Sequence, residues 1–236
     1  MRSSEYSRHL SSLKRLLLPA GNVSETSVEY PPPPWTLCGE AIIAIQLVSI
    51  RQVRSAIPSP LRIVPVLPGR TLSVIALLHY GSGSTLQYHE LIIAPALVAA
   101  RARVGSWISH IFVDSEASMH GGRALWKLPK QLGKFTWDSN TQVRMDSSEL
   151  SVDVTLTTHS MASVTIPVIA PAFGTLSPHV NWFAAKGRGR LRKVQGELHV
   201  SSPSARWLEF GGTSRMFRLE RFQGSIGPGR EISTQR

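Results

Sequence analysis

Runs rich in isoleucine, leucine and valine alternate with short polar or proline-containing breaks along most of the chain. Residues 36–48 are almost continuously apolar, which is typical of a strand covered on both faces. Residues 104–113 alternate well enough between apolar and polar positions to indicate a further strand. The expected strands are residues 36–48, 61–66, 71–80, 86–98, 104–113, 135–137, 142–145, 150–156, 163–168, 191–200 and 216–226.

Two short helices are expected between these strands. Ser49 can cap the first, which Pro58 stops. Asp114 or Ser115 can cap the second, which runs towards Leu125. With no longer helix and no solenoid repeat, the pattern predicts a mainly β (α+β) fold, an antiparallel β-barrel or strongly bent sheet with a few short helices.

A proline-rich segment separates an N-terminal tail from this fold. Pro31–Pro34 cannot donate backbone hydrogen bonds, so it marks a boundary rather than a strand interior. Residues 1–29 are serine-rich and basic, and their apolar run is too short for the core of a secretory signal. We therefore expect a flexible tail at residues 1–29 and one domain at residues 30–236.

Basic residues outnumber acidic ones by 26 to 15, which gives a formal net charge of +11. Such a charge permits attraction to nucleic acid, anionic lipid or anionic small molecules. The only dense basic run is Lys186–Lys193, and its glycine spacing gives no helix face that could enter a DNA groove. We expect this run to be a solvated turn between strands, and we expect no specific nucleic-acid partner.

Cys38 is the only cysteine, which excludes an internal disulfide and metal sites built on thiolates. The histidines lack the i, i+4 pairing of a helical zinc site, so no metal is expected. The single cysteine fits a reducing compartment, and we expect a cytoplasmic location. No apolar stretch approaches the roughly 20 residues that a membrane-spanning helix needs.

The residues that most strongly indicate chemistry lie between positions 114 and 137. Lys130 follows Pro129 directly and stands between two leucines, a stiff and largely apolar setting in which an ammonium ion loses hydration. The alternative is a surface loop whose lysine points to water. If the lysine is buried instead, its side chain needs an explanation other than solvation.

Residues 114–116, 122–123 and 129–130 together resemble the active-site segment of the acetoacetate decarboxylase family. Tyr88–Glu90 resembles the family's short strand motif, and Pro31–Trp35 resembles its proline-rich opening. The resemblance implies a cone-like β-barrel and a cofactor-independent carbon–carbon lyase, such as a decarboxylase. It also implies a small-molecule carbonyl or apolar substrate and a homo-oligomer.

By the same resemblance, Lys130 is the imine-forming nucleophile and Glu90 is the catalytic acid/base. Arg123 either holds a substrate carboxylate or caps the helix end. For Glu90 the alternative is a strand carboxylate that faces water beside His89. The candidate substrate-binding residues are Arg123, Gln131, His120 and Trp126.

Three positions depart from the family pattern. Gln131 stands where the decarboxylase has a second lysine after the reactive one. An ungapped count back from Glu90 places a second family acid on Ile75, and Gly39 stands where the family has an arginine early in its first strand. The loss of these charges predicts a drier and roomier pocket, and it weakens the expectation that acetoacetate is the natural substrate.

Two further functions remain open at this point. A Schiff-base aldolase or dehydratase would use the same lysine chemistry. A non-catalytic protein that binds an apolar, carotenoid-like or lipid-like ligand would use the barrel alone, and the chain also resembles the plant neoxanthin-deficiency family in its proline–tryptophan opening and in Gln46–Val48. Lys130 separates these functions, because a carrier does not need it.

Overall fold

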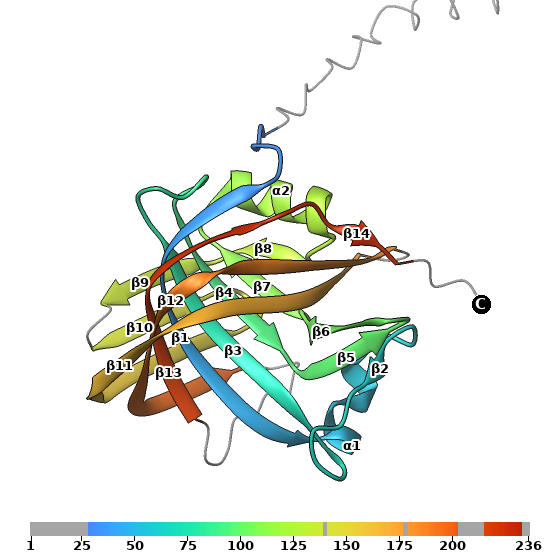
Figure 1. Cartoon of the computed structure of the whole chain (residues 1–236), viewed down its shortest axis with the longest axis horizontal. Helices are drawn as coiled ribbons and strands as arrows, with labels where there is room; N and C mark the ends of the chain where they lie inside the picture. Colours follow the sequence, from blue (N-terminus) through green and yellow to red (C-terminus); the bar gives the residue numbers. More distant parts are fainter. Residues whose placement is uncertain (1–27, 139–140, 177–178, 203–214, 233–236) are drawn as a thin grey trace, which may run out of the picture.

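The apolar runs form one large, strongly bent sheet (Figure 1). Side chains of this sheet line a cavity. The computed structural model describes residues 28–138, 141–176, 179–202 and 215–232. Residues 1–27, which make up nearly all of the expected tail, lie outside the described part of the chain. The elements in chain order are β1 (Trp35–Ser49), α1 (Ile50–Val53), η2 (Arg54–Ala56), β2 (Arg62–Ile63), β3 (Arg70–Tyr80), β4 (Tyr88–Ala94), β5 (Ala96–Ala100), β6 (Arg103–Trp107), β7 (His110–Val113), α2 (Glu116–Trp126), β8 (Lys130–Leu132), β9 (Lys134–Asp138), β10 (Gln142–Asp146), β11 (Ser151–Leu176), β12 (His179–Ser201), β13 (Arg215–Ile226) and β14 (Arg230–Glu231).

The strand order is β2-β5-β6-β11-β12-β13-β1-β3-β4-β7-β8, with β9, β10 and β14 attached at its side. Most pairings are antiparallel, but β6 with β11 and β7 with β8 are parallel. Pro95 separates β4, which pairs with β3, from β5, which pairs with β6. Among the described residues the pairings do not close into a barrel, so the mainly β, strongly bent sheet is confirmed and the closed alternative is not.

Side chains of β1 alternate between two interiors. Ala41, Ile43 and Ile45 line the cavity. Ile42 and Ala44 lie in a separate core that includes residues of β10 and β11. Because both faces of β1 are covered, a continuous apolar sequence forms a strand here without an exposed apolar face.

The strands β11 and β12 are much longer than the sequence pattern indicated. The expected strands 150–156 and 163–168 belong largely to the single strand β11, and 191–200 lies inside β12. The basic run Lys186–Lys193 is part of β12, so its assignment to a turn was wrong. Gly187 marks a close approach of strands instead, because a Cβ there would run into the carbonyl oxygen of Gln223 on β13.

The two helices occupy opposite ends of the sheet, as Figure 1 shows. Ser115 caps α2, and its Oγ accepts a hydrogen bond from the backbone N–H of Ser118 at 3.2 Å. Ser49 stands at the N-cap of α1, but its side chain makes no capping hydrogen bond. Neither helix of the described residues has the length and apolar character needed to cross a membrane.

Candidate functional site

Lys130 is the first residue of β8, at the end of the sheet that α2 covers (Figure 1). Lys127 ends α2 in the left-handed conformation, and Pro129 precedes the strand. The Arg123 Nε donates a hydrogen bond to the Lys130 carbonyl oxygen at 2.7 Å, which fixes the start of the strand against the helix. In the parallel pairing with β7, Lys130 stands opposite Ile111, which lines the cavity.

Glu90 faces the same cavity from β4. Its neighbour His89 points to the other face of the strand, where it pairs with Asp114 at 2.7 Å. The Lys130 Nζ lies 2.7 Å from the Glu90 Oε2, and the two side chains are only 3% and 6% exposed. A buried amine and a buried carboxylate within hydrogen-bonding distance form a pair that can exchange a proton.

Three hydroxyl groups surround this pair. The Tyr80 and Tyr88 hydroxyls donate to the two Glu90 carboxylate oxygens, each at 3.4 Å, and the Lys130 Nζ donates to the Ser118 Oγ at 2.9 Å. Burial raises the pKa of both tyrosine hydroxyls well above their usual range, and the Glu90 charge raises each pKa further. Both phenols therefore stay protonated and act as donors at neutral pH.

Two glycines of α2 make room for the site. A Cβ on Gly122 would lie 2.5 Å from the Cδ of Lys130, so only glycine lets the lysine stem pass along the helix. A Cβ on Gly121 would lie 2.7 Å from the ring of Trp35, whose own ring meets that of Trp126 edge-on at 4.7 Å. The Gly-Gly step thus packs α2 directly against the lysine and the aromatic wall of the cavity.

The cavity has a volume of about 460 Å³ and is lined mostly by aliphatic and aromatic side chains of β1, β3, β4, β11, β12 and β13. Glu90 and Lys130 meet it at the end near Trp126 and Leu128. The only other charged lining residue among those described is Glu40, which is held by Arg218 at 2.6 Å. The arrangement places one amine–carboxylate pair in a chamber whose other described lining residues, apart from Glu40, carry no charge.

The profile of the acetoacetate decarboxylase (ADC) family matches residues 18–175. The chain belongs to the acetoacetate decarboxylase family. Its sequence is 30% identical over 107 residues to the protein NEOXANTHIN-DEFICIENT 1 of Arabidopsis thaliana, and 29% over 111 residues to that of Solanum lycopersicum. These matches cover 45% and 47% of this chain, and they span only 38% and 37% of the lengths of the plant proteins.

Solved structures share the fold. An acetoacetate decarboxylase from Legionella pneumophila superposes with a TM-score of 0.60 at 14% identity, over 93% of this chain and 94% of that one. The enduracididine biosynthesis enzyme MppR, complexed with the condensation product of pyruvate and imidazole 4-carboxaldehyde, superposes with a TM-score of 0.57 at 16% identity, over 89% and 94% of the two chains. At these identities the superpositions show that the fold is shared.

Of the candidate substrate-binding residues named from the family pattern, Trp126 lines the cavity and the others do not. Arg123 is largely exposed and holds the Lys130 backbone. The Gln131 side chain donates to Glu149 at 3.0 Å, on the solvent side of β8. His120 is half-buried on α2 outside the cavity lining.

Ile75 and Gly39, which stand where the family pattern has charged residues, do not line the cavity. Ile75 packs in the core on the opposite face of β3, while its neighbours Val74 and Ala76 line the cavity. Its apolar character therefore says nothing about the chamber. Gly39 lies at a bulge of β1, where a Cβ would run into the carbonyl oxygen of His79.

Tyr80, Tyr88 and Ser118 were missed by the sequence analysis. Strand alternation could have found Tyr88, which is two residues before Glu90 and so on the same face. Tyr80 stands opposite Tyr88 in the β3–β4 ladder, and only that register brings it to the site. Within the described residues, no cluster of histidine, cysteine or carboxylate side chains could hold a metal ion.

Proposed function

We propose that the protein is a lysine-dependent lyase that forms a Schiff base between Lys130 and the carbonyl group of an apolar keto acid or related carbonyl compound. The observation that carries the proposal is the Lys130–Glu90 contact of 2.7 Å at the wall of an apolar cavity. Exposed lysine–carboxylate pairs are common and contribute little to stability, but a buried pair that borders an open chamber indicates chemistry.

The reaction begins with proton transfer from the Lys130 ammonium to Glu90. The neutral amine attacks the substrate carbonyl carbon, and Glu90 returns the first proton to the oxygen to give a carbinolamine. Glu90 then takes a second proton from the nitrogen and passes it to the oxygen, which leaves as water. The resulting iminium accepts the electron pair of the bond to the carboxylate, so that carbon dioxide departs and an enamine remains. Protonation of the enamine carbon and hydrolysis then release the ketone and restore the amine.

Tyr80 and Tyr88 support Glu90 in this cycle. Their hydroxyls donate to the carboxylate oxygens and hold the group in place while it gives and takes a proton. Because their raised pKa keeps them protonated, they remain donors throughout. This support is a positioning role, since neither hydroxyl has to touch the reacting carbonyl.

The lining favours a substrate that is apolar over most of its surface. Among the described lining residues, Lys130 is the only lysine or arginine, and it becomes the imine nitrogen during the reaction. A substrate carboxylate would then lie near Glu90 in apolar surroundings without a fixed cation. Such a carboxylate is poorly stabilised, and loss of carbon dioxide removes the charge from the chamber.

Two other functions share parts of this site. The MppR complex holds a condensation product of pyruvate and an aldehyde, and imine-based aldol or dehydratase chemistry would use the same amine. The apolar lining and the similarity to NEOXANTHIN-DEFICIENT 1 support binding of an apolar ligand without catalysis. The Schiff-base lyase is preferred because a carrier gains nothing from a buried amine–carboxylate pair.

Borohydride trapping tests the proposal. The protein is incubated with a long-chain methyl ketone, and in parallel with acetoacetate, and is then reduced and mapped by peptide mass spectrometry. We expect a secondary-amine adduct on Lys130, formed more readily with the long-chain ketone, and carbon dioxide release from a long-chain β-keto acid. Lys134→Met, which changes an exposed lysine on β9, should leave the adduct unchanged.

Lys130→Met separates the enzyme from the carrier. In the enzyme the variant abolishes trapping and carbon dioxide release. Retention of a fluorescent apolar ligand by both proteins, with no adduct on Lys130 in the wild type, would instead establish the carrier. An adduct on a different lysine would refute the assignment of the nucleophile.

A further inference from the structure

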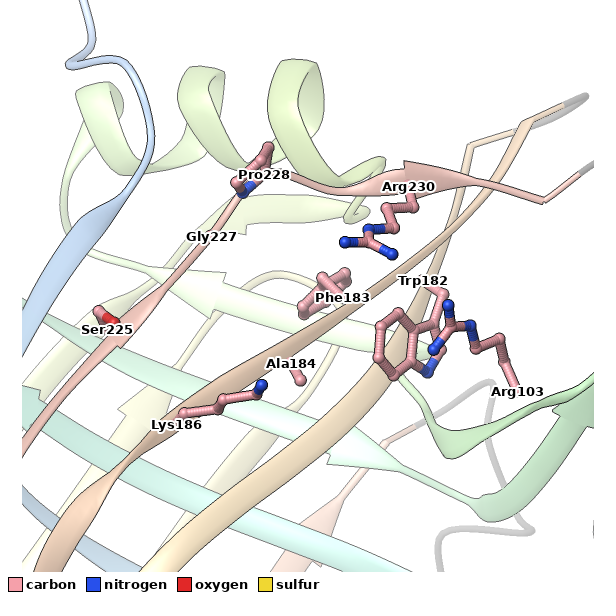
Figure 2. A pocket seen from close by; sticks show the side chains of 9 residues that line it. All are labelled: Arg103, Trp182, Phe183, Ala184, Lys186, Ser225, Gly227, Pro228 and Arg230. Carbon is pink, nitrogen blue, oxygen red and sulfur yellow. The ribbon is translucent and has the colours of Figure 1, made fainter.

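A second concave site lies on the outside of the sheet, where β12, β13, β14 and the start of β6 meet (Figure 2). It has a volume of about 360 Å³. Its lining residues are Arg103, Trp182, Phe183, Ala184, Lys186, Ser225, Gly227, Pro228 and Arg230. We call it the basic pocket.

Strand alternation puts the basic pocket on the other side of β12 from the cavity. Ala185 lines the cavity, whereas Trp182, Ala184 and Lys186 line the basic pocket, and Phe183 borders both. A ligand held here would therefore lie outside the chamber that contains the lysine–glutamate pair. The basic pocket is a separate site from the one in which Lys130 acts.

An irregularity of the sheet produces the hollow. The ladder between β12 and β13 ends at the pair Ala185–Ile226. Pairing resumes with β14 at Trp182–Arg230. Between these pairs, two residues of β12 face the three residues 227–229, so the outer segment bulges away from β12 and leaves a recess.

Three cations border this recess, and none of its lining residues is acidic. The Arg103 guanidinium lies 4.4 Å from the centre of the Trp182 ring, which orients it by a cation–π contact. Figure 2 shows Arg230 above the Trp182 ring, and Lys186 on the far side of Ala184 from that ring. Over the described residues, no ion pair within 4.0 Å engages any of these three cations.

The neighbouring carboxylate is already engaged elsewhere. Glu231 follows Arg230 on β14, and its Oε1 lies 2.8 Å from the Nδ1 of His179. Three like charges around one recess repel each other, and an anion placed between them would relieve that repulsion. Within the described part of the protein, no acidic side chain balances the positive charge of the basic pocket.

We propose that the basic pocket binds a phosphate group, either of a free phosphate ester or of a lipid headgroup. Two guanidinium groups offer paired N–H donors in the planar arrangement that suits phosphate oxygens, and the lysine adds a point charge. Three positive charges match a doubly charged phosphate better than a singly charged carboxylate. The rings of Trp182 and Phe183 and the side of Pro228 give an apolar surface for the part of the molecule that bears the phosphate.

Calorimetric titration of the full chain with inorganic pyrophosphate tests for the free-phosphate source. Sedimentation with phosphatidylcholine vesicles, with and without phosphatidic acid, tests for the lipid source. We expect one saturable site in at least one arm. Arg103→Gln or Arg230→Gln should weaken that binding about tenfold or more, as expected when a charge-assisted hydrogen bond is lost.

The matched control is Arg51→Gln. Arg51 is an exposed arginine on α1, at the opposite end of the molecule from β14 (Figure 1), and the substitution removes the same charge. Binding of pyrophosphate alone assigns the site to a soluble phosphate compound, and binding of acidic vesicles alone assigns it to a lipid headgroup. Equal weakening by Arg51→Gln, or no binding in either arm by a wild type whose circular dichroism shows it folded, would overturn the proposal.

Discussion

Replacing Lys130 with methionine should destabilise the protein strongly and in a manner that depends on pH. Methionine keeps the apolar stem of the side chain and removes the ammonium. Glu90 would then remain buried with only the two tyrosine hydroxyls as partners, each at 3.4 Å. Removing one member of a buried ion pair costs about 3–5 kcal/mol of unfolding free energy, because the other charge is left without compensation.

The free-energy cost of protonating the uncompensated carboxylate is of the same size, and it makes the loss of stability depend on pH. A buried carboxylate without a partner cation takes up a proton instead of staying charged. For a glutamate of usual pKa, that proton costs about 3.7 kcal/mol at pH 7 and about 1 kcal/mol at pH 5. The folded variant then binds more protons than its unfolded chain, so its stability falls as the pH rises from 5 to 7.

Urea unfolding of the wild type and the variant at pH 5 and pH 7, followed by tryptophan fluorescence, measures this difference. The double variant Lys130→Met with Glu90→Gln should recover most of the loss, because neither charge then remains. Lys134→Met makes the same chemical change at an exposed position and should alter the unfolding free energy by less than about 0.5 kcal/mol.

If Lys130→Met lowers the unfolding free energy by less than about 1 kcal/mol at pH 7, with no change between the two pH values, the amine does not compensate the Glu90 charge. Equally, additive effects of the two single substitutions would mean that the amine and the carboxylate do not interact. Either result would remove the geometric basis of the proposed Schiff-base chemistry.

Two further substitutions probe the site, and a third probes the opposite face of its strands. Gly122→Ala should displace the Lys130 side chain, since the new Cβ would lie 2.5 Å from its Cδ, and borohydride trapping should fall while circular dichroism still shows a folded sheet. Tyr88→Phe keeps the ring but removes one hydrogen-bond donor to the Glu90 carboxylate. It should slow carbon dioxide release about tenfold and shift the pH–rate profile. A purely structural tyrosine would not produce that shift. Burial, and next the neighbouring His89, lower the pKa of His79. This group therefore contributes stability above the unfolded pKa of 6.5, and that contribution is lost as the pH falls. His79→Gln should reduce the drop in the urea unfolding midpoint between pH 7 and pH 5.

Local sequence determined the strands and helices that depend on neighbouring residues. The apolar run of β1, the Ser115 cap of α2 and the end of α2 before Pro129 all follow from nearest-neighbour preferences. The segment around Lys130 could also be recognised as a candidate site, because a lysine between apolar residues after a proline is unusual on its own. Glu90 could be named from its family motif, but the strand pattern alone did not decide whether it faced the cavity or water.

The tertiary structure decided which faces are buried and what meets there. β3 and β4 carry apolar residues on both faces, so composition could not distinguish the cavity side from the core side, and Ile75 was assigned to the wrong one. The length of β11 and β12 depends on their pairing with each other across polar residues, which a strand pattern does not register. The lysine–glutamate pair and the basic pocket each join residues from distant parts of the chain, and such contacts arise from strand register rather than from local preference.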